Sequence, residues 1–104
     1  MREKTVEARL RHGVEKMGGA CLKWTSMGQD GVPDRIVILP GRVIFVEMKT
    51  ETGKLSKVQE YQIDRLRRLK QTACVVYGVE GVRQFLRDLE EGRIRPVYGR
   101  QLDD

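Results

Sequence analysis

The sequence has few cysteines and histidines and no long apolar run, which argues against disulfide-bonded, zinc-binding and membrane-spanning proteins. Its two cysteines, Cys21 and Cys74, lie outside any CxxC or Cys/His spacing, so we expect small buried residues and no disulfide or thiolate metal site. The one histidine, His12, has no partner at a ligand spacing and is assigned no role. No run approaches the ~20 apolar residues of a membrane span, and the N-terminus lacks the apolar centre of a signal peptide. We therefore expect a cytoplasmic protein without a membrane partner.

Charge, by contrast, is abundant and unbalanced. Lysine and arginine number 20 against 15 aspartates and glutamates, a net charge of +5, while 39% of the 104 residues are hydrophobic. This content is too apolar for a disordered chain and suits one globular domain. The positive charge favours a polyanionic partner such as a nucleic acid, although charge alone does not identify one.

Hydrophobic spacing predicts three helices. The first covers 6–17 and ends at Gly18-Gly19. The second opens at Ser56, and the third ends before Gly92. One face of the second helix is expected to carry Leu55, Val58, Gln62, Leu66 and Leu69. The buried face of the third is expected to carry Val82, Phe85, Leu86 and Leu89.

Strands are predicted at 20–24, 35–39, 43–48 and 74–77, where β-branched and apolar residues cluster between turn signals. The order α-β-β-β-α-β-α predicts an α/β fold with a mixed four-stranded sheet flanked by helices. We expect one domain over 1–92, followed by a C-terminal tail, 93–104, that is left unassigned and is a candidate part of a dimer interface.

The hairpin around Pro40-Gly41 determines which residues face one another. If the turn centres on this pair, the numbers of facing residues add to 81, so Asp34 faces Glu47 on one side of the sheet. The alternation of strand side chains places Lys49 on that same side. A loop one residue longer or shorter would break this pairing, and Pro-Gly suits a type II turn better than the turns that hairpins favour.

Two carboxylates beside a lysine in such apolar strands need an explanation, because burying a charge without a partner costs several kcal/mol. Protonation of one carboxylate, neutralisation by Lys49, or a bound divalent cation would each relieve their repulsion. Carboxylate oxygens with room for water suit Mg²⁺. An ion pair of Lys49 with Asp34 or Glu47 on a solvated edge is the alternative, and we interpret the three charges together as a metal site.

Pro33-Asp34, twelve intervening residues and Glu47-Met48-Lys49 resemble the PD-(D/E)XK nuclease signature. The wider run GVPDRIVIL…VIFVEMKTETGKLSKVQ is similar to the VRR-NUC branch, the virus-type replication-repair nucleases, over roughly residues 3–90. The resemblance implies a restriction-endonuclease-like core and DNA cleavage that depends on Mg²⁺ or Mn²⁺. Stand-alone phage and bacterial members resemble Holliday-junction resolvases that work as homodimers, which implies a branched DNA partner. Nothing in composition or spacing shows junction preference.

The resemblance also implies roles for individual residues. Asp34 and Glu47 would hold the metal with the Met48 carbonyl, and Lys49 would orient the attacking water or stabilise charge on the phosphate. Glu7 would join them from the first helix, although a carboxylate in a first helical turn is also favourable without any catalysis. Gln59 lies where the family often has a glutamine near the active centre. Ser56 and Gln59 also form an S-x-x-Q capping box, which explains the glutamine equally well.

Candidate DNA contacts are Lys54 and Lys57 at the start of the second helix, and Lys4 and Arg9 on the first, although each of them taken alone is more commonly a solvated surface charge. A homodimer has a physical argument, because paired cuts in a nearly two-fold junction need two sites related in the same way. A nuclease acting on flaps, nicks or ends, and a DNA-binding module without catalysis, remain alternatives.

Overall fold

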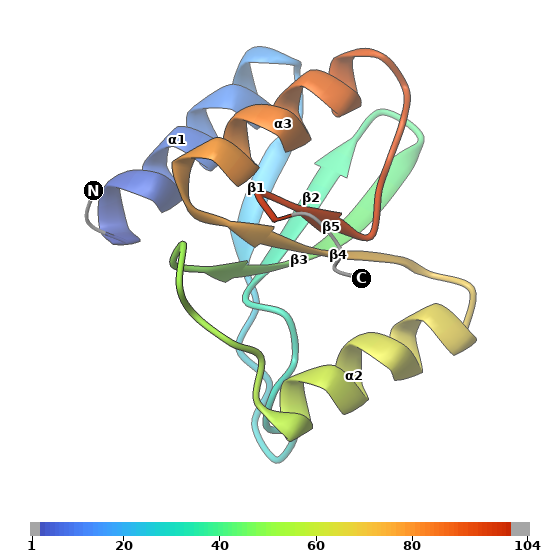
Figure 1. Cartoon of the computed structure of the whole chain (residues 1–104). Helices are drawn as coiled ribbons and strands as arrows, with labels where there is room; N and C mark the ends of the chain where they lie inside the picture. Colours follow the sequence, from blue (N-terminus) through green and yellow to red (C-terminus); the bar gives the residue numbers. More distant parts are fainter. Residues whose placement is uncertain (1–2, 101–104) are drawn as a thin grey trace.

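The computed structural model describes residues 3–100, which form one sheet with helices on both faces (Figure 1). The helices are α1 (Glu3–Lys16), α2 (Lys57–Arg68) and α3 (Gly78–Glu90). The strands are β1 (Ala20–Lys23), β2 (Arg35–Leu39), β3 (Arg42–Lys49), β4 (Thr72–Tyr77) and β5 (Val97–Tyr98). The predicted α/β class, the mixed sheet and its flanking helices are confirmed. Within residues 3–100, no helix combines the length and apolar character that crossing a bilayer would require.

The sheet differs from the prediction by one strand, because its order is β1-β2-β3-β4-β5. The first three strands are antiparallel, and β4 and β5 are added parallel to β3. The fifth strand comes from the segment that sequence analysis left unassigned. Its Tyr98 is fully buried against Phe85, so the core continues beyond residue 92. Residues 101–104 of the predicted tail lie outside the described residues.

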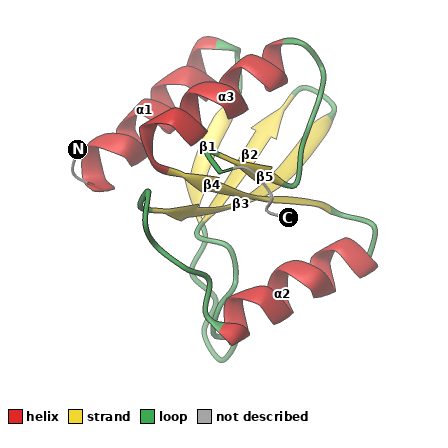
Figure 2. Cartoon of the chain, viewed as in Figure 1, coloured by secondary structure: helices red, strands yellow, loops and turns green. Residues whose placement is uncertain are grey.

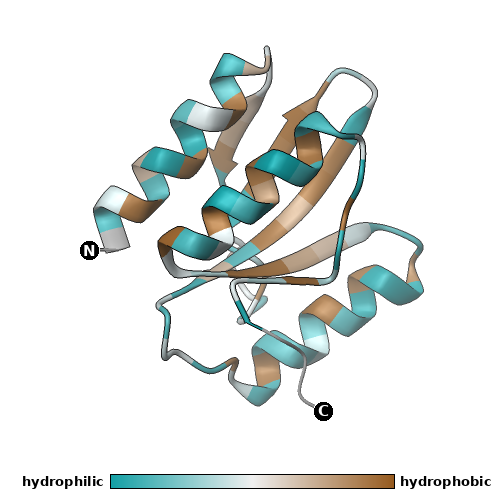
Figure 3. Cartoon of the chain, turned by 45° about the horizontal axis from the view of Figure 1, so that its top comes forward, coloured by the Kyte–Doolittle hydropathy of each residue, from teal (hydrophilic) through white to brown (hydrophobic). Residues whose placement is uncertain are grey.

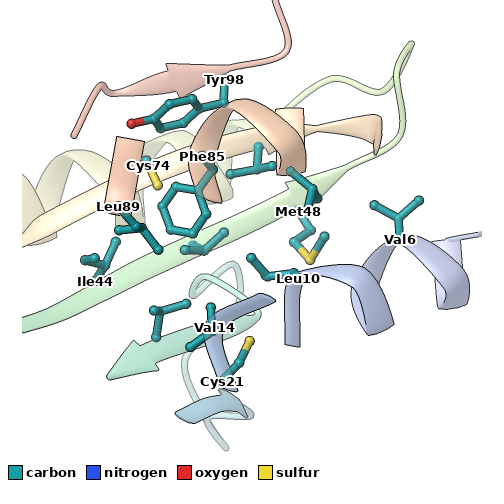
Figure 4. Packing of buried hydrophobic residues seen from close by; sticks show 14 residues of the cluster. Val6, Leu10, Val14, Cys21, Ile44, Met48, Cys74, Phe85, Leu89 and Tyr98 are labelled. Atoms are coloured by element: carbon teal, nitrogen blue, oxygen red, sulfur yellow. The ribbon is translucent and has the colours of Figure 1, made fainter. Parts of the chain in front are cut away.

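Two hydrophobic layers sit on opposite faces of the sheet. α1 and α3 cover one face together, and α2 lies alone on the other (Figure 2). The larger layer packs Leu10 and Val14 of α1 and Phe85 of α3 against the strands (Figure 4). The smaller layer packs Ile63 of α2 against β4. Cys21 and Cys74 are free and buried, as predicted.

The apolar face predicted for the second helix is only partly buried. Val58 is 46% exposed and Leu69 is 60% exposed, whereas Gln62 and Ile63 are buried. Val58 lies against Gly31 of the β1–β2 loop, outside the contact with the sheet. Leu69 is already the C-cap residue of α2. Helical spacing could not distinguish the stripe that packs on β4 from the adjacent stripe that faces the loop.

The hairpin register agrees with the prediction. Arg35 pairs with Val46 and Leu39 pairs with Arg42, so the numbers of facing residues add to 81. Gly41 has a φ of +77°, which a glycine adopts readily at the third position of a type II turn. The turn therefore fixes which strand residues share each face of the sheet.

Candidate active site

Asp34 lies at the bend just before β2, between the ends of two neighbouring strands. Its Oδ1 accepts a hydrogen bond of 3.2 Å from the Met48 N–H, and its backbone carbonyl accepts one of 3.0 Å from the Trp24 N–H. Burial, aided by the carboxylate of Glu7, raises the pKa of Asp34 to about 6. The Met48 N–H and the positive charge of Arg35 act in the opposite direction. The carboxylate thus occupies a place where negative charge is poorly solvated.

Glu47 precedes the peptide group that Asp34 contacts, and its side chain is buried at 4% exposure. Its Oε2 accepts a 3.0 Å hydrogen bond from Gln59 Nε2 and lies 3.8 Å from Lys49 Nζ. In the register, Glu47 pairs with Val75 and Lys49 with Tyr77, which places both side chains on the face that α2 covers. Extending the hairpin register by one pair puts Asp34 opposite Glu47. The structure therefore brings the three predicted charges to one end of the sheet.

Gln59 takes part in both arrangements that the sequence left open. The capping box forms, because Gln59 Oε1 accepts from the Ser56 N–H at 2.9 Å and the Ser56 hydroxyl accepts from the Gln59 N–H at 3.1 Å. Since the side-chain oxygen is held by the cap, the amide nitrogen points away from it, toward Glu47. The cap therefore orients the group that contacts the buried carboxylate.

Glu7 lies on the first turns of α1, which packs on the face of the sheet opposite Glu47 and Lys49. Its Oε1 accepts a 2.6 Å hydrogen bond from Arg35, whose side chain is buried. Arg35 was not among the residues predicted from the sequence. The available signal was its position beside Asp34 in a strand, since strand alternation sends its side chain to the face where α1 packs.

The remaining predicted residues are the candidate DNA contacts, and all four are exposed. Lys54 and Lys57 are exposed at the start of α2, and Lys4 and Arg9 are exposed on α1. A pocket of about 210 Å³ opens beside Lys49. It is lined by Val6, Met48, Lys49, Thr50, Glu51, Thr52 and Gly78.

Trp24 and Tyr61 are two aromatic residues that could stack on bases. Trp24 packs against Phe45 with 5.4 Å between ring centres, so its ring belongs partly to the hydrophobic layer. Tyr61 is 55% exposed on α2.

The donor set determines which cofactor the site can hold. Among residues 3–100, no group of three or more histidine, cysteine, aspartate or glutamate side chains is placed to bind one ion. Two carboxylates, with the Met48 carbonyl at the same strand end, still fit Mg²⁺ or Mn²⁺, because Mg²⁺ commonly keeps several waters and takes one or two protein carboxylates. Hard oxygen donors exclude a preference for soft metals.

Comparisons with known proteins agree with this architecture. No family model matches the chain. The protein named "Putative nuclease p44", from Acyrthosiphon pisum secondary endosymbiont phage 1, is 43% identical over 67 residues, which cover 64% of this chain and 72% of that protein.

Solved structures give a fuller match. One described as "VRR_NUC domain" has a TM-score of 0.76 at 31% identity and covers 82% of this chain and 94% of its own. A second, described as "VRR_NUC domain protein", has a TM-score of 0.68 at 18% identity over 99% and 98% of the two chains. The Archaeoglobus fulgidus Holliday junction resolvase Hjc has a TM-score of 0.55 at 20% identity over 72% and 67%. The last two likenesses concern the fold alone. The first combines a similar fold with 31% identity and covers 94% of the related chain. The chain therefore belongs to the VRR-NUC family.

Proposed function

We propose that this protein is a metal-dependent DNA endonuclease whose active centre lies at the end of β3. The observation that carries the proposal is the contact of Asp34 with the Met48 N–H, directly beside the buried Glu47 and the Lys49 ammonium. The raised pKa of Asp34 means that its charged form is costly in the folded chain, and a divalent cation beside it would offset that cost. The family membership and the phage relative named as a nuclease point to the same chemistry.

Each side chain has a definite task in this proposal. Asp34, Glu47 and the Met48 carbonyl would hold Mg²⁺ or Mn²⁺, which would supply Lewis-acid activation of the phosphate and of a bound water. Lys49 orients that water or stabilises negative charge on the phosphate. Gln59 fixes the orientation of the Glu47 carboxylate through its 3.0 Å hydrogen bond.

Glu7 is held by Arg35 at 2.6 Å. It contributes negative charge near Asp34 and would bind the metal through a water molecule. Lys54, Lys57, Lys4 and Arg9 are exposed cations and are proposed to contact DNA phosphates.

The substrate proposed is a branched DNA, with the four-way junction foremost, cut by a homodimer. The fold likeness to a protein named as a Holliday junction resolvase supports this choice. An uncharged open face of the sheet supports the dimer. This open face consists of Leu22, Ile36, Ile38, Val43 and Phe45, which the register of β1, β2 and β3 places on the side of α2.

α2 packs against β4 and leaves part of the open face in contact with solvent. Leu22 is 49%, Ile38 39% and Val43 45% exposed, and the strands of the sheet are largely apolar (Figure 3). A DNA contact needs positive charge, which these side chains lack, so a second copy of the chain is the occupant we propose.

Cleavage of four labelled DNAs tests the proposed function. Wild type, Lys49→Ala and the matched control Lys16→Ala, an exposed lysine in the last turn of α1, are incubated with a four-way junction, a flap, a nicked duplex and a linear duplex. Reactions contain Mg²⁺, Mn²⁺ or a chelator. We expect paired, symmetric cuts in the junction that require metal and Lys49 and that Lys16→Ala retains.

Other outcomes would decide against parts of the proposal. Equal cutting of all four DNAs would remove the resolvase assignment and favour a nuclease acting on flaps, nicks or ends. Unchanged cleavage by Lys49→Ala would contradict the assigned mechanism. Binding without cleavage in either metal would identify a DNA-binding module.

A further inference from the structure

Arg100, from the segment after β5, contacts the loop that follows the candidate catalytic lysine. One of its guanidinium nitrogens donates hydrogen bonds to the backbone carbonyls of Glu51 and Gly53, each at 2.7 Å. The guanidinium carbon lies 3.9 Å from the centre of the Tyr77 ring, a cation–π geometry. Arginine suits this position because its planar group can stack on a ring while donating several hydrogen bonds.

The contacted loop, residues 50–53, forms a wall of the pocket beside Lys49. Its Gly53 N–H donates to the Thr50 carbonyl at 3.1 Å, which closes a turn, and Glu51 and Thr52 are exposed. A polar, exposed loop of this kind has little hydrophobic packing to hold it. The two bonds from Arg100 therefore join it to the body of the protein.

The backbone before Arg100 packs closely against β4 and α3. Gly99 has a φ of +87°, and a Cβ atom built on it would lie 2.2 Å from the Tyr77 carbonyl oxygen. The Gly99 N–H donates to Gln84 Oε1 on α3 at 3.0 Å. The pairing of β5 with β4 and the closeness allowed by glycine bring Arg100 to the loop.

Tyr77 provides a second connection between Arg100 and the site. Tyr77 and Lys49 are register partners in the parallel pair of β4 and β3, so their side chains leave the sheet on the same face. Arg100 thus contacts both the segment that continues from Lys49 and the residue that lies beside it.

We propose that Arg100 is a positioning residue for the active centre, which holds the 50–53 loop and thereby the orientation of Lys49. This inference rests on the proposed nuclease function. Arg100 acts through the loop, because the nitrogen that binds the two carbonyls has both of its hydrogens directed at the protein. Loosening this contact should slow the chemical step while DNA affinity changes little, since a displacement of about 1 Å in a catalytic group can reduce the rate by ~10²-fold.

Two variants and a matched control test the inference. Arg100→Ala removes the contacts, and Arg100→Lys keeps the charge but loses the planar fork. Arg87→Ala removes one exposed arginine from the last turn of α3, a helix that begins next to Tyr77 and ends about 20 Å away. For each protein, hydrogen–deuterium exchange of a peptide covering 50–55 and the melting temperature are measured without DNA. Single-turnover cleavage is then measured over a range of protein concentrations.

We expect Arg100→Ala to speed exchange in the loop and to lower the maximal cleavage rate about 10- to 100-fold. The half-saturating concentration should change less than about twofold. Arg100→Lys should fall between wild type and Arg100→Ala in both measurements, and Arg87→Ala should match wild type. Loop exchange and cleavage unaffected by Arg100→Ala would overturn the inference. A loss confined to the half-saturating concentration, with unchanged loop exchange, would also overturn it and would identify a phosphate contact.

The exchange measurement separates this inference from the proposed function. If wild type cleaves none of the DNAs, the proposed function fails, while faster loop exchange in Arg100→Ala still supports the anchoring role. If wild type cleaves and the loop exchanges at the same rate in every variant, the proposed function stands and the anchoring role is lost.

Discussion

In metal-free solution, replacing Asp34 by asparagine should stabilise the protein at neutral pH, although the residue lies at the centre of the candidate site. Burial raises the pKa of Asp34 from 3.8 to about 6 in the folded protein. Below pH 3.8 the folded and unfolded chains both hold the proton, so this group makes no difference to stability. Between the two pKa values the folded chain keeps a proton that the unfolded chain has released, and stability falls as the pH rises. Above about pH 6 the cost of holding the charged carboxylate is complete.

The size of the effect follows from the pKa difference. The rise of about two in the pKa of Asp34 corresponds to a loss of at most ~3 kcal/mol in the free energy of unfolding. Because the side chain is only partly buried, water screens part of this cost, and we expect about 1–2 kcal/mol. For a domain of this size, that gain raises the melting temperature by on the order of 10 °C. Asparagine keeps an oxygen that can accept from the Met48 N–H, so this hydrogen bond is retained.

Thermal melts with a chelator at about pH 7.5 and about pH 4 measure the effect, with Asp64→Asn as the matched change at an exposed site. The Asp34→Asn variant should melt higher than wild type only at the higher pH. Added Mg²⁺ should raise the melting temperature of wild type and leave that of the variant nearly unchanged, since a ligand stabilises only the state that binds it. A variant no more stable than wild type at about pH 7.5, or equally stabilised at both pH values, would refute the reasoning.

Three further outcomes are expected. Gln59→Ala and Ser56→Ala should each lower the free energy of unfolding by about 1 kcal/mol in urea titrations through loss of the helix cap. Only Gln59→Ala should also slow cleavage strongly, and equal cleavage by the two variants would contradict the role proposed for the contact of Gln59 with Glu47. Gly99→Ala, whose new Cβ would lie 2.2 Å from a carbonyl oxygen, should cost about 2–4 kcal/mol. Gly28→Ala has a similar φ of +81° but nothing within 4 Å, so it should cost only about 1 kcal/mol; equal losses would show that the close contact is unimportant. Ile38→Lys on the open face should shift the protein from dimer to monomer in light scattering after gel filtration, and an unchanged mass would remove this face from the interface.

The sequence was sufficient to predict the hairpin register around the candidate site, because the register depends on local geometry. A short turn at Pro40-Gly41 fixes the register, and the register fixes that Asp34 and Glu47 share a face. The helix cap at Ser56 could also be predicted, because the two residues that form it, Ser56 and Gln59, are only three positions apart. What spacing could not decide was whether Gln59 caps the helix or contacts the site, because one amide does both.

Features that depend on tertiary packing could not be predicted in the same way. The pairing of Arg35 with Glu7 joins residues 28 positions apart and follows from how α1 lies on β2. The strand β5 has only two residues, too few to show alternation. Its burial depends on Tyr98, whose hydroxyl donates to the buried Asp88 at 2.8 Å. No periodic pattern reports such long-range contacts.

The most direct test of the central claim is cleavage of an immobile four-way junction by wild type and Glu47→Gln, side by side, in Mg²⁺ and in Mn²⁺. The substitution keeps the shape of the buried side chain and removes its charge, and Glu60→Gln on the exposed first turn of α2 is the matched control. The account predicts metal-dependent cuts by wild type and Glu60→Gln and none by Glu47→Gln. Cleavage by Glu47→Gln at the wild-type rate would contradict it.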